Sequence, residues 1–231
     1  MEKIFTILCP TDFSECSLNA IEYASRLGEK FKAELILFHV LNREDYEKLS
    51  PNDPDGRYQK DFVQDKLRSL QQAVKDESLI QGLNSCKIEI REGKIVHETL
   101  SFAKEINADL IVVGTEGIND LRSNYIGSRA SRMVQQCETD IMVIPRKVYF
   151  KPPRKLIYAS DYIEEDKLAV QKVAELAGFF DSEIDIVHVS PTQKALDKSL
   201  HMTVVEEIRP FVRYEKTNFV LKSFRDDLAL G

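Results

Sequence analysis

Val113–Ser131 is the segment of this chain whose glycine and hydroxyl residues are best suited to binding chemistry. Gly114 and Gly117 follow an apolar run, and after nine further residues Gly127 and Ser128 precede a helical pattern. Glycines let a ligand approach the backbone closely, and the free amides at a helix start favour an anion such as phosphate. The spacing is neither GxGxxG nor GxxxxGK(S/T). It predicts a phosphate-binding turn, and an ordinary glycine-rich turn is the alternative.

Asp12 is a second candidate, because it follows the first apolar run of the chain through Pro10 and Thr11. Ligands of doubly wound sheets bind beyond the carboxyl ends of the strands, where the strand order reverses. If the first strand lies beside the strand that ends at Gly114, Asp12 faces the glycine turn. Its carboxylate can then accept a hydrogen bond from an exocyclic amine, such as that of adenine. The alternative, that Asp12 caps the following helix or stays in water, is equally compatible with the sequence.

An alternation of strands and helices over the first 146 residues supplies the framework for these candidates. Apolar or alternating runs predict five strands, at Lys3–Cys9, Glu34–Val40, Ser85–Arg91, Asp109–Gly114 and Asp140–Pro145. Helical spacing predicts four helices, at Ser17–Phe31, residues 58–77, Ile95–Ile106 and residues 125–136. Strands that alternate with helices through right-handed crossovers form parallel sheets. We therefore predict an α/β fold, a doubly wound parallel five-stranded sheet with helices on both faces.

The chain after the Pro152-Pro153 pair repeats its own beginning. An offset of 149 residues aligns Ile7–Val40 with Leu156–Val189 without a gap, and eight positions are identical. The identical pairs include Asp12 with Asp161 and His39 with His188. Unrelated strand–helix–strand units share apolar patterns by chance, but the match of Asp12 and of the His-Val pair in one register favours a duplication.

The repeat predicts three segments: a complete domain at residues 1–146, a linker at 147–154 and a partial second copy at 155–231. The partial copy has no counterpart of the glycine turn, because the offset of 149 would place it beyond Gly231. It also has Ala159 and Ser160 in place of Pro10 and Thr11. The sequence leaves open whether Gly231 is a natural end or a truncation.

Composition and charge argue against several classes of protein. The 32 basic and 38 acidic residues give a net charge of −6, which disfavours a nucleic-acid-binding surface. No apolar run approaches the ~20 residues of a membrane helix. The apolar start is interrupted at Asp12 and is too short for a signal peptide. We expect a cytoplasmic protein that binds neither nucleic acid nor membrane.

The cysteines, histidines and serines show no spacing typical of catalysis or metal binding. The four cysteines form no CxxC pair, and we expect Cys16 to be the most exposed of them. His39 and His188 end equivalent strands, where hydrogen-bonded histidines in the core or at the edge of the site are expected rather than a metal pair. No His, Asp and Glu group has metal-ligand spacing, and no serine lies in a GxSxG motif. We predict no catalytic and no metal-binding residues.

The candidate residues together resemble a known family. The pattern G-x2-G-x9-G-S after a strand that ends in VVG, with the PTDFS start and a second strand that ends in HV, is similar to the universal stress protein family. The resemblance covers Lys3–Arg146 in full and continues more weakly to about Val189 and beyond. It implies the fold of the adenine nucleotide alpha hydrolase-like proteins, and the tandem members of the family suit the repeat.

The resemblance also implies a site, residue by residue. The adenine would be contacted by Pro10, Thr11 and Asp12 and by the backbone of Val40. The ribose and phosphates would be lined by Val113, Gly114 and Gly117. Phosphate would be bound by Gly127 and Ser128 with the amides of Arg129 and Ala130.

The ligand that the resemblance implies is ATP, or AMP or ADP, with Mg²⁺ as a companion ion. The implied function is a nucleotide-binding module whose bound state tunes partner interactions in the stress response. Two departures favour an alternative, a nucleotide-free interaction or scaffold protein of the same fold. Ala130 stands where members often carry a hydroxyl residue, and Glu116 puts a negative charge inside the turn. The partial second copy, without a glycine turn, is expected to bind no nucleotide by itself.

Catalysis is expected to be absent or limited to slow ATP hydrolysis, because no general base or metal-activating cluster is visible in the sequence. An adenylating ligase of the wider fold class has a Ser-rich SGGxDS loop, which Thr11–Ser14 does not supply. Members of the family commonly pair through the fifth strand. We therefore expect a homo-oligomer, in the simplest case a dimer, through the apolar edge of Asp140–Pro145.

Overall fold

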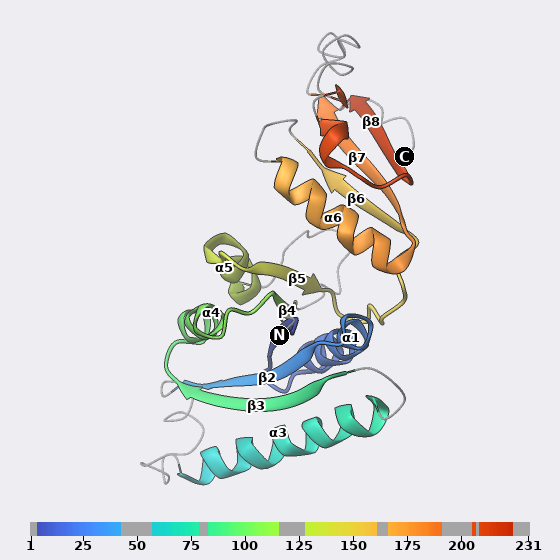
Figure 1. Cartoon of the computed structure of the whole chain (residues 1–231). Coiled ribbons are helices and arrows are strands. Elements are labelled where there is room, and N and C mark those ends of the chain that lie inside the picture. Colours follow the sequence, from blue (N-terminus) through green and yellow to red (C-terminus); the bar gives the residue numbers. More distant parts are fainter. Residues whose placement is uncertain are drawn as a thin grey trace. The chain divides into compact units, whose positions relative to one another are not determined.

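The computed structural model describes residues 4–42, 57–78, 83–115, 128–160, 166–190, 205–206 and 208–223. The chain divides into two compact units, unit 1 from Met1 to Phe150 and unit 2 from Lys151 to Gly231. Each unit has its own parallel sheet (Figure 1). Each also has its own clusters of buried hydrophobic residues, so each is held together by its own core.

Unit 1 contains five strands and four helices among its described residues. In chain order they are β1 (Thr6–Pro10), α1 (Glu15–Phe31), β2 (Glu34–Leu41), α3 (Arg57–Ser78), β3 (Ser85–Glu92), α4 (Ile95–Glu105), β4 (Leu110–Gly114), α5 (Ser128–Gln136) and β5 (Asp140–Ile144). The strand order is β3-β2-β1-β4-β5, and all neighbouring strands are parallel. The predicted doubly wound five-stranded sheet is confirmed.

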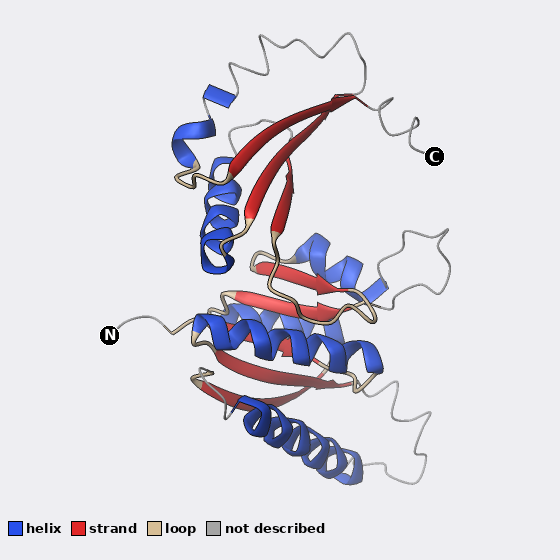
Figure 2. Ribbon diagram, turned by 90° about the vertical axis from the view of Figure 1, so that its right-hand side faces the viewer, coloured by secondary structure: helices blue, strands red, loops and turns tan. Residues whose placement is uncertain are grey.

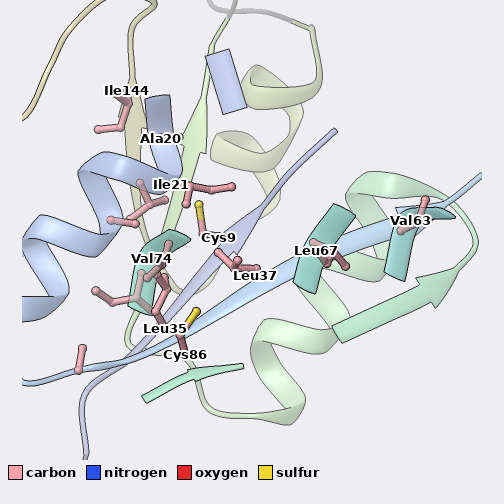
Figure 3. Close-up of a cluster of buried hydrophobic side chains, with 14 of the residues drawn as sticks. Cys9, Ala20, Ile21, Leu35, Leu37, Val63, Leu67, Val74, Cys86 and Ile144 are labelled. Carbon is pink, nitrogen blue, oxygen red and sulfur yellow. The ribbon is translucent and has the colours of Figure 1, made fainter. Parts of the chain in front are cut away.

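Both faces of this sheet are covered by helices, as the continuous apolar strands predict (Figure 2). Ile7 and Cys9 of β1 pack with residues of α1 and α3. Figure 3 shows Cys9 in this cluster with Ile21 of α1 and Leu67 of α3. Leu8, between them, packs with residues of α4 and α5 on the opposite face. Each fully buried Leu or Ile side chain contributes about 1.5–3 kcal/mol, so the central position of β1 follows from its sequence.

α1 has a start and an end that its sequence specifies locally. Ser14 caps the start, because its side chain accepts a hydrogen bond from the Ser17 amide at 3.2 Å. Lys32 ends the helix in the left-handed conformation, with φ of 52°. The buried positions of α1 recur at helical spacing, at Ala20, Ala24 and Leu27 among others, so one face of the helix lies on the sheet.

Unit 2 contains, among its described residues, the strands β6 (Lys155–Ala159), β7 (Glu183–Ser190) and β8 (Thr217–Ser223), the helix α6 (Asp166–Phe180) and a short 3₁₀ turn η2 (Arg209–Phe211). The strand order is β6-β7-β8, and both pairs are parallel. The register of unit 1 recurs here at the offset of 149: Ile7 pairs with Leu35, and Leu156 pairs with Ile184.

Among the described residues, one face of the smaller sheet has no covering helix, whereas its counterpart in unit 1 is covered. Ile157 is 72% exposed, whereas Leu8, which precedes it by the offset of 149, is 0% exposed. Leu8 lies in the cluster with residues of α4 and α5. The described residues of unit 2 contain no counterpart of those helices or of β4 and β5. They therefore show only the first half of the architecture of unit 1.

Candidate functional site

The carboxyl ends of β1 and β4 lie side by side, as the candidate site requires. Ile7 pairs with Leu110 and Leu8 pairs with Ile111 in parallel register. The strand order reverses at this pair, because β2 and β3 continue on one side of β1 while β4 and β5 lie on the other. Open α/β sheets bind ligands beyond the carboxyl ends of the strands at such a reversal.

The turn from β1 into α1 is held by hydrogen bonds between near neighbours in the sequence. Thr11 Oγ1 lies 2.9 Å from Ser17 Oγ and accepts the Phe13 amide at 3.0 Å. The Ser14 amide donates to Asp12 Oδ1 at 3.0 Å. The Thr11 side chain is buried in these contacts, so its role is to fix the turn rather than to face outward.

Asp12 projects from this turn with 54% of its side chain exposed. Partial burial raises the pKa of its carboxyl, but hydrogen bonds from Ser14 and Ser17 outweigh that effect, and the net pKa lies below its usual value. The group is therefore ionised at neutral pH. Asp12 Oδ2 lies 3.8 Å from the guanidinium of Arg129 at the start of α5. One carboxylate oxygen thus closes the turn, and the other faces the start of α5.

Gly114, the last residue of β4, is required by packing against α1. A Cβ atom at this position would lie 2.5 Å from the Cys16 carbonyl oxygen and 3.0 Å from Cys16 Sγ. The Cys16 thiol itself donates to the carbonyl oxygen of Thr115. Cys16 is only 7% exposed, so the expectation that it is the most exposed cysteine is wrong, and Cys137 is less buried. Gly114 thus has a packing role, whatever it contributes to a ligand.

Three of the predicted site residues have side chains that belong to the core. Val40, Val113 and Ala130 are buried in the cluster that contains residues of α4 and α5. Only their backbone atoms remain for a ligand. A hydroxyl residue in place of Ala130 would therefore put its hydroxyl into the packing between α5 and the sheet.

The remaining predicted residues fall into two groups. Pro10 ends β1 and is partly buried, Ser128 begins α5, and Arg129 has 55% of its side chain exposed. Gly117 and Gly127 lie outside the described residues, as does Glu116. The structure therefore brings Asp12 to the start of α5, and the phosphate contacts of the two glycines stay a prediction.

His39 holds the turn from the neighbouring strand β2. Its Nδ1 lies 2.7 Å from the Thr11 carbonyl oxygen, which confirms the expected hydrogen-bonded histidine. Its ring stacks on Phe13 with a centroid distance of 4.9 Å, and the Lys66 ammonium of α3 lies 5.4 Å from the Phe13 ring centroid. Burial lowers the pKa of His39. Sequence reasoning missed Phe13 and Lys66, because helical and strand periodicity carries no signal for a turn residue or for its distant neighbours.

Unit 2 repeats part of this arrangement at the offset of 149. His188 Nδ1 lies 2.8 Å from the Ser160 carbonyl oxygen, as His39 does from that of Thr11. Ser160 Oγ donates to Asp166 Oδ2 at 2.6 Å, where unit 1 has the hydroxyl pair Thr11 and Ser17. Asp161, the counterpart of Asp12, lies outside the described residues.

A comparison with known protein families agrees with the fold and with the local geometry of the site. The family model described as the universal stress protein family matches residues 3–145. The chain belongs to the universal stress protein family. Universal stress protein MJ0531 of Methanocaldococcus jannaschii is 27% identical over 140 residues, which cover 61% of this chain and 81% of that protein. Universal stress protein YxiE of Bacillus subtilis is 27% identical over 146 residues, 60% of this chain and 97% of that protein.

A solved universal stress protein has a similar fold over most of the chain. The crystal structure of a universal stress protein from Archaeoglobus fulgidus covers 97% of this chain and 80% of its own, with a TM-score of 0.75 and 19% identity. At that identity the likeness establishes the fold alone. It extends over both units, whereas the family model ends within unit 1.

An open depression of about 1050 Å³ lies in unit 2. It is lined at the amino ends of the strands by residues that include Arg154, Phe180 and Lys216. Lys216 is paired with Asp181 at 2.6 Å. Ligands of open α/β sheets bind at the opposite, carboxyl ends of the strands. The depression is therefore not a candidate for the nucleotide site.

Two features are absent from the part of the chain that the structure describes. No group of three or more His, Cys, Asp and Glu residues there is arranged to hold a metal ion. No helix there has the length and apolar character needed to cross a membrane.

Proposed function

We propose that unit 1 binds an adenine nucleotide at the carboxyl ends of β1 and β4, and that the bound state tunes the interaction of this universal stress protein with partner proteins. The observation that carries the proposal is the position of Asp12, whose Oδ2 faces the start of α5 at a distance of 3.8 Å from Arg129. An ionised acceptor and a helix N-terminus thus lie together at the reversal of the strand order.

The two ends of a nucleotide match the two sides of this arrangement. The exocyclic amine of adenine is a donor, and the Asp12 carboxylate, whose pKa is lowered, is an acceptor. The first amides of α5 and the Arg129 guanidinium suit phosphate oxygens. The pair of Asp12 with Arg129 is exposed, and exposed ion pairs contribute about 0–1 kcal/mol. Arg129 can therefore leave Asp12 for phosphate at little cost.

Binding rather than rapid turnover is the role that these residues support. Asp12 is already engaged by hydrogen bonds of the turn, and its lowered pKa makes it a weak general base. Mg²⁺ would arrive with the triphosphate rather than through a protein cluster of ligands. We propose at most slow hydrolysis of ATP.

A nucleotide-free interaction protein of the same fold is the second candidate. The observation that favours it is the same ion pair, because Arg129 gives Asp12 a partner from within the chain. Glu116, inside the predicted phosphate turn, adds to this argument. The two candidates differ in one measurable property, the binding of adenine nucleotide by the folded protein.

Thermal unfolding of the full chain with and without Mg-ATP tests the proposal. Saturation at about 100 times Kd stabilises by about 2.7 kcal/mol, which raises the unfolding temperature of unit 1 by roughly 5–11 °C. Gly127→Glu, which would add an acidic side chain to the predicted phosphate turn, should abolish the rise. Asp181→Asn is the matched control, because it changes an exposed carboxylate of unit 2. No rise at millimolar Mg-ATP from folded, ligand-free protein would select the nucleotide-free candidate.

We also propose that β5 is the contact between copies of this chain. Among the described strands, β5 pairs only with β4, and its residues Ile141, Met142 and Val143 are partly buried. An apolar strand at a sheet edge is a template for pairing with another chain. Light scattering should show a dimer at micromolar concentration, and Met142→Lys should shift it to the monomer. A monomer in the unmodified protein would contradict this proposal without affecting that of nucleotide binding.

A further inference from the structure

His39 contacts the chain on both sides of Asp12. Its Nδ1 lies 2.7 Å from the carbonyl oxygen of Thr11, the residue before Asp12. Its ring stacks on Phe13, the residue after Asp12, with a centroid distance of 4.9 Å and an interplanar angle of 25°. His39 of β2 therefore contacts both residues that flank Asp12 in the sequence.

Phe13 has a backbone conformation that needs such support. Its φ is 63°, in the left-handed region, which is costly for a residue with a bulky side chain. The Phe13 amide donates to Thr11 Oγ1 at 3.0 Å, and its ring packs against the core cluster that contains residues of α1 and α3. Residues in such conformations persist where their surroundings hold them. The stacked ring of His39 is one of those surroundings.

The chemical form of His39 follows from its partner and its burial. The Thr11 carbonyl oxygen can only accept, so Nδ1 carries the hydrogen of this bond. Burial lowers the pKa of His39, so the ring is neutral at neutral pH, with Nδ1–H as donor and Nε2 as acceptor. A neutral ring leaves the turn in one hydrogen-bonded state across the physiological range.

We infer that His39 is a positioning residue for the adenine site, where its Nδ1–H and its ring fix Thr11 and Phe13 and thereby hold Asp12 toward α5. The inference rests on the proposed function. The apparent affinity for a ligand falls in proportion to the fraction of molecules whose site is in the competent conformation. His39 would act by keeping that fraction high, without touching the nucleotide.

Unit 2 supplies a control within the same molecule. His188 makes the same bond, with Nδ1 2.8 Å from the Ser160 carbonyl oxygen. It lies at the equivalent strand end of unit 2, outside the nucleotide site proposed for unit 1. A substitution at His188 therefore reports what the loss of this bond does to a fold of this kind when the proposed nucleotide site is left unchanged.

Two variants separate the two contacts of His39. His39→Asn keeps an N–H donor close to the position of Nδ1 and removes the ring. His39→Phe keeps a flat ring and removes the donor. The affinity of the full chain for Mg-ATP, measured by calorimetry, should fall about three- to tenfold in His39→Phe, the range expected for one hydrogen bond. His39→Asn should stay closer to the unmodified protein, and His188→Phe should not change the affinity.

A second readout distinguishes positioning from a loss of structure. Inosine triphosphate has an oxo group in place of the exocyclic amine of ATP, so an acceptor replaces the donor at the position that Asp12 is proposed to bind. If His39 positions Asp12, the preference for ATP over inosine triphosphate should shrink in His39→Phe, as it should in Asp12→Asn. A purely structural effect would lower both affinities equally and would overturn the inference.

The remaining outcomes are also decisive. Unchanged ATP affinity in His39→Phe, or an equal loss in His39→Asn and His39→Phe, would overturn the inference and leave the proposed function standing. Failure of the unmodified protein to bind Mg-ATP would overturn the proposed function itself, and the inference with it.

Discussion

The Asp12 carboxylate lies 3.8 Å from the Arg129 guanidinium, although the two residues belong to the first turn of the chain and to the last helix of unit 1. The pairing of β1 with β4 makes this possible, because it sets the two strand ends side by side. The carboxylate suits a donor group of a ligand, and the guanidinium suits an anionic group. The first prediction tests whether Arg129 serves such an anion.

Arg129→Gln should weaken the binding of Mg-ATP about 10- to 100-fold, the effect of losing one charged hydrogen-bonding group. The free energy of unfolding without nucleotide should change by less than about 1 kcal/mol, because the pair with Asp12 is exposed. Calorimetric titration and urea unfolding followed by circular dichroism give the two quantities. Arg132→Gln is the control, since it removes the same charge from an exposed position of the same helix. An equal loss of affinity in both variants would show only a general effect of charge.

Acidification should destabilise unit 1 through His39. Burial lowers the pKa of His39 in the folded state below 6.5, so the unfolded state binds more protons as the pH falls below 6.5. The contribution of the neutral ring to stability is therefore complete above pH 6.5 and is lost as the pH falls through the folded pKa. The free energy of unfolding, measured between pH 7.5 and pH 5, should fall less steeply in His39→Asn than in the unmodified protein. Parallel slopes would mean that His39 titrates alike in both states.

Gly114→Ala should destabilise unit 1 by about 1–3 kcal/mol, the usual cost of an added methyl group in a packed site. The new Cβ would lie 2.5 Å from the Cys16 carbonyl oxygen, which is backbone and cannot rotate away. Gly178→Ala in α6 is the matched control, because the nearest atom to its Cβ lies 4.0 Å away. Alanine is favoured over glycine in helices, so this control should be neutral or stabilising by up to about 1 kcal/mol. Urea unfolding of both variants measures the difference, and equal stabilities would refute the packing role of Gly114.

The sequence could predict the sheet because its strands are specified by local apolar runs. The run around Ile7, Leu8 and Cys9 is apolar at every position, as a strand buried on both faces requires, and the structure buries all three. The steric need for Gly114 could not be predicted in this way, because Cys16 meets it only after α1 packs on β4. The exposure of Ile157 could not be predicted from its apolar strand β6 either. Ile157 is 72% exposed, because among the described residues no helix covers this face of its sheet.

The place of the candidate site in the sheet could also be predicted from the sequence, but its detailed contacts could not. Asp12 and the start of α5 could be assigned to one edge of the sheet from the order of strands and from family resemblance. The contact of His39 with Thr11 and Phe13 depends on the register of β2 against β1, in which Cys9 lies opposite Leu37 and Pro10 lies opposite Phe38. Periodicity predicts that two strands exist and does not predict their register to one residue.

Asp166→Asn should destabilise unit 2 by about 1–3 kcal/mol, the cost of leaving buried donors without an acceptor. Asp166 is buried and accepts hydrogen bonds from Tyr158 and Ser160, each at 2.6 Å. An amide offers one acceptor oxygen in place of two, so one hydroxyl loses its partner. Native-state hydrogen exchange should show faster opening of β7 amides in Asp166→Asn, with β2 amides unchanged, and no change in the exposed control Asp181→Asn. Unchanged protection of the β7 amides would mean that the hydrogen bonds of Asp166 do not stabilise the contact of β6 with α6. Faster exchange of the β2 amides as well would mean that the two units do not unfold independently.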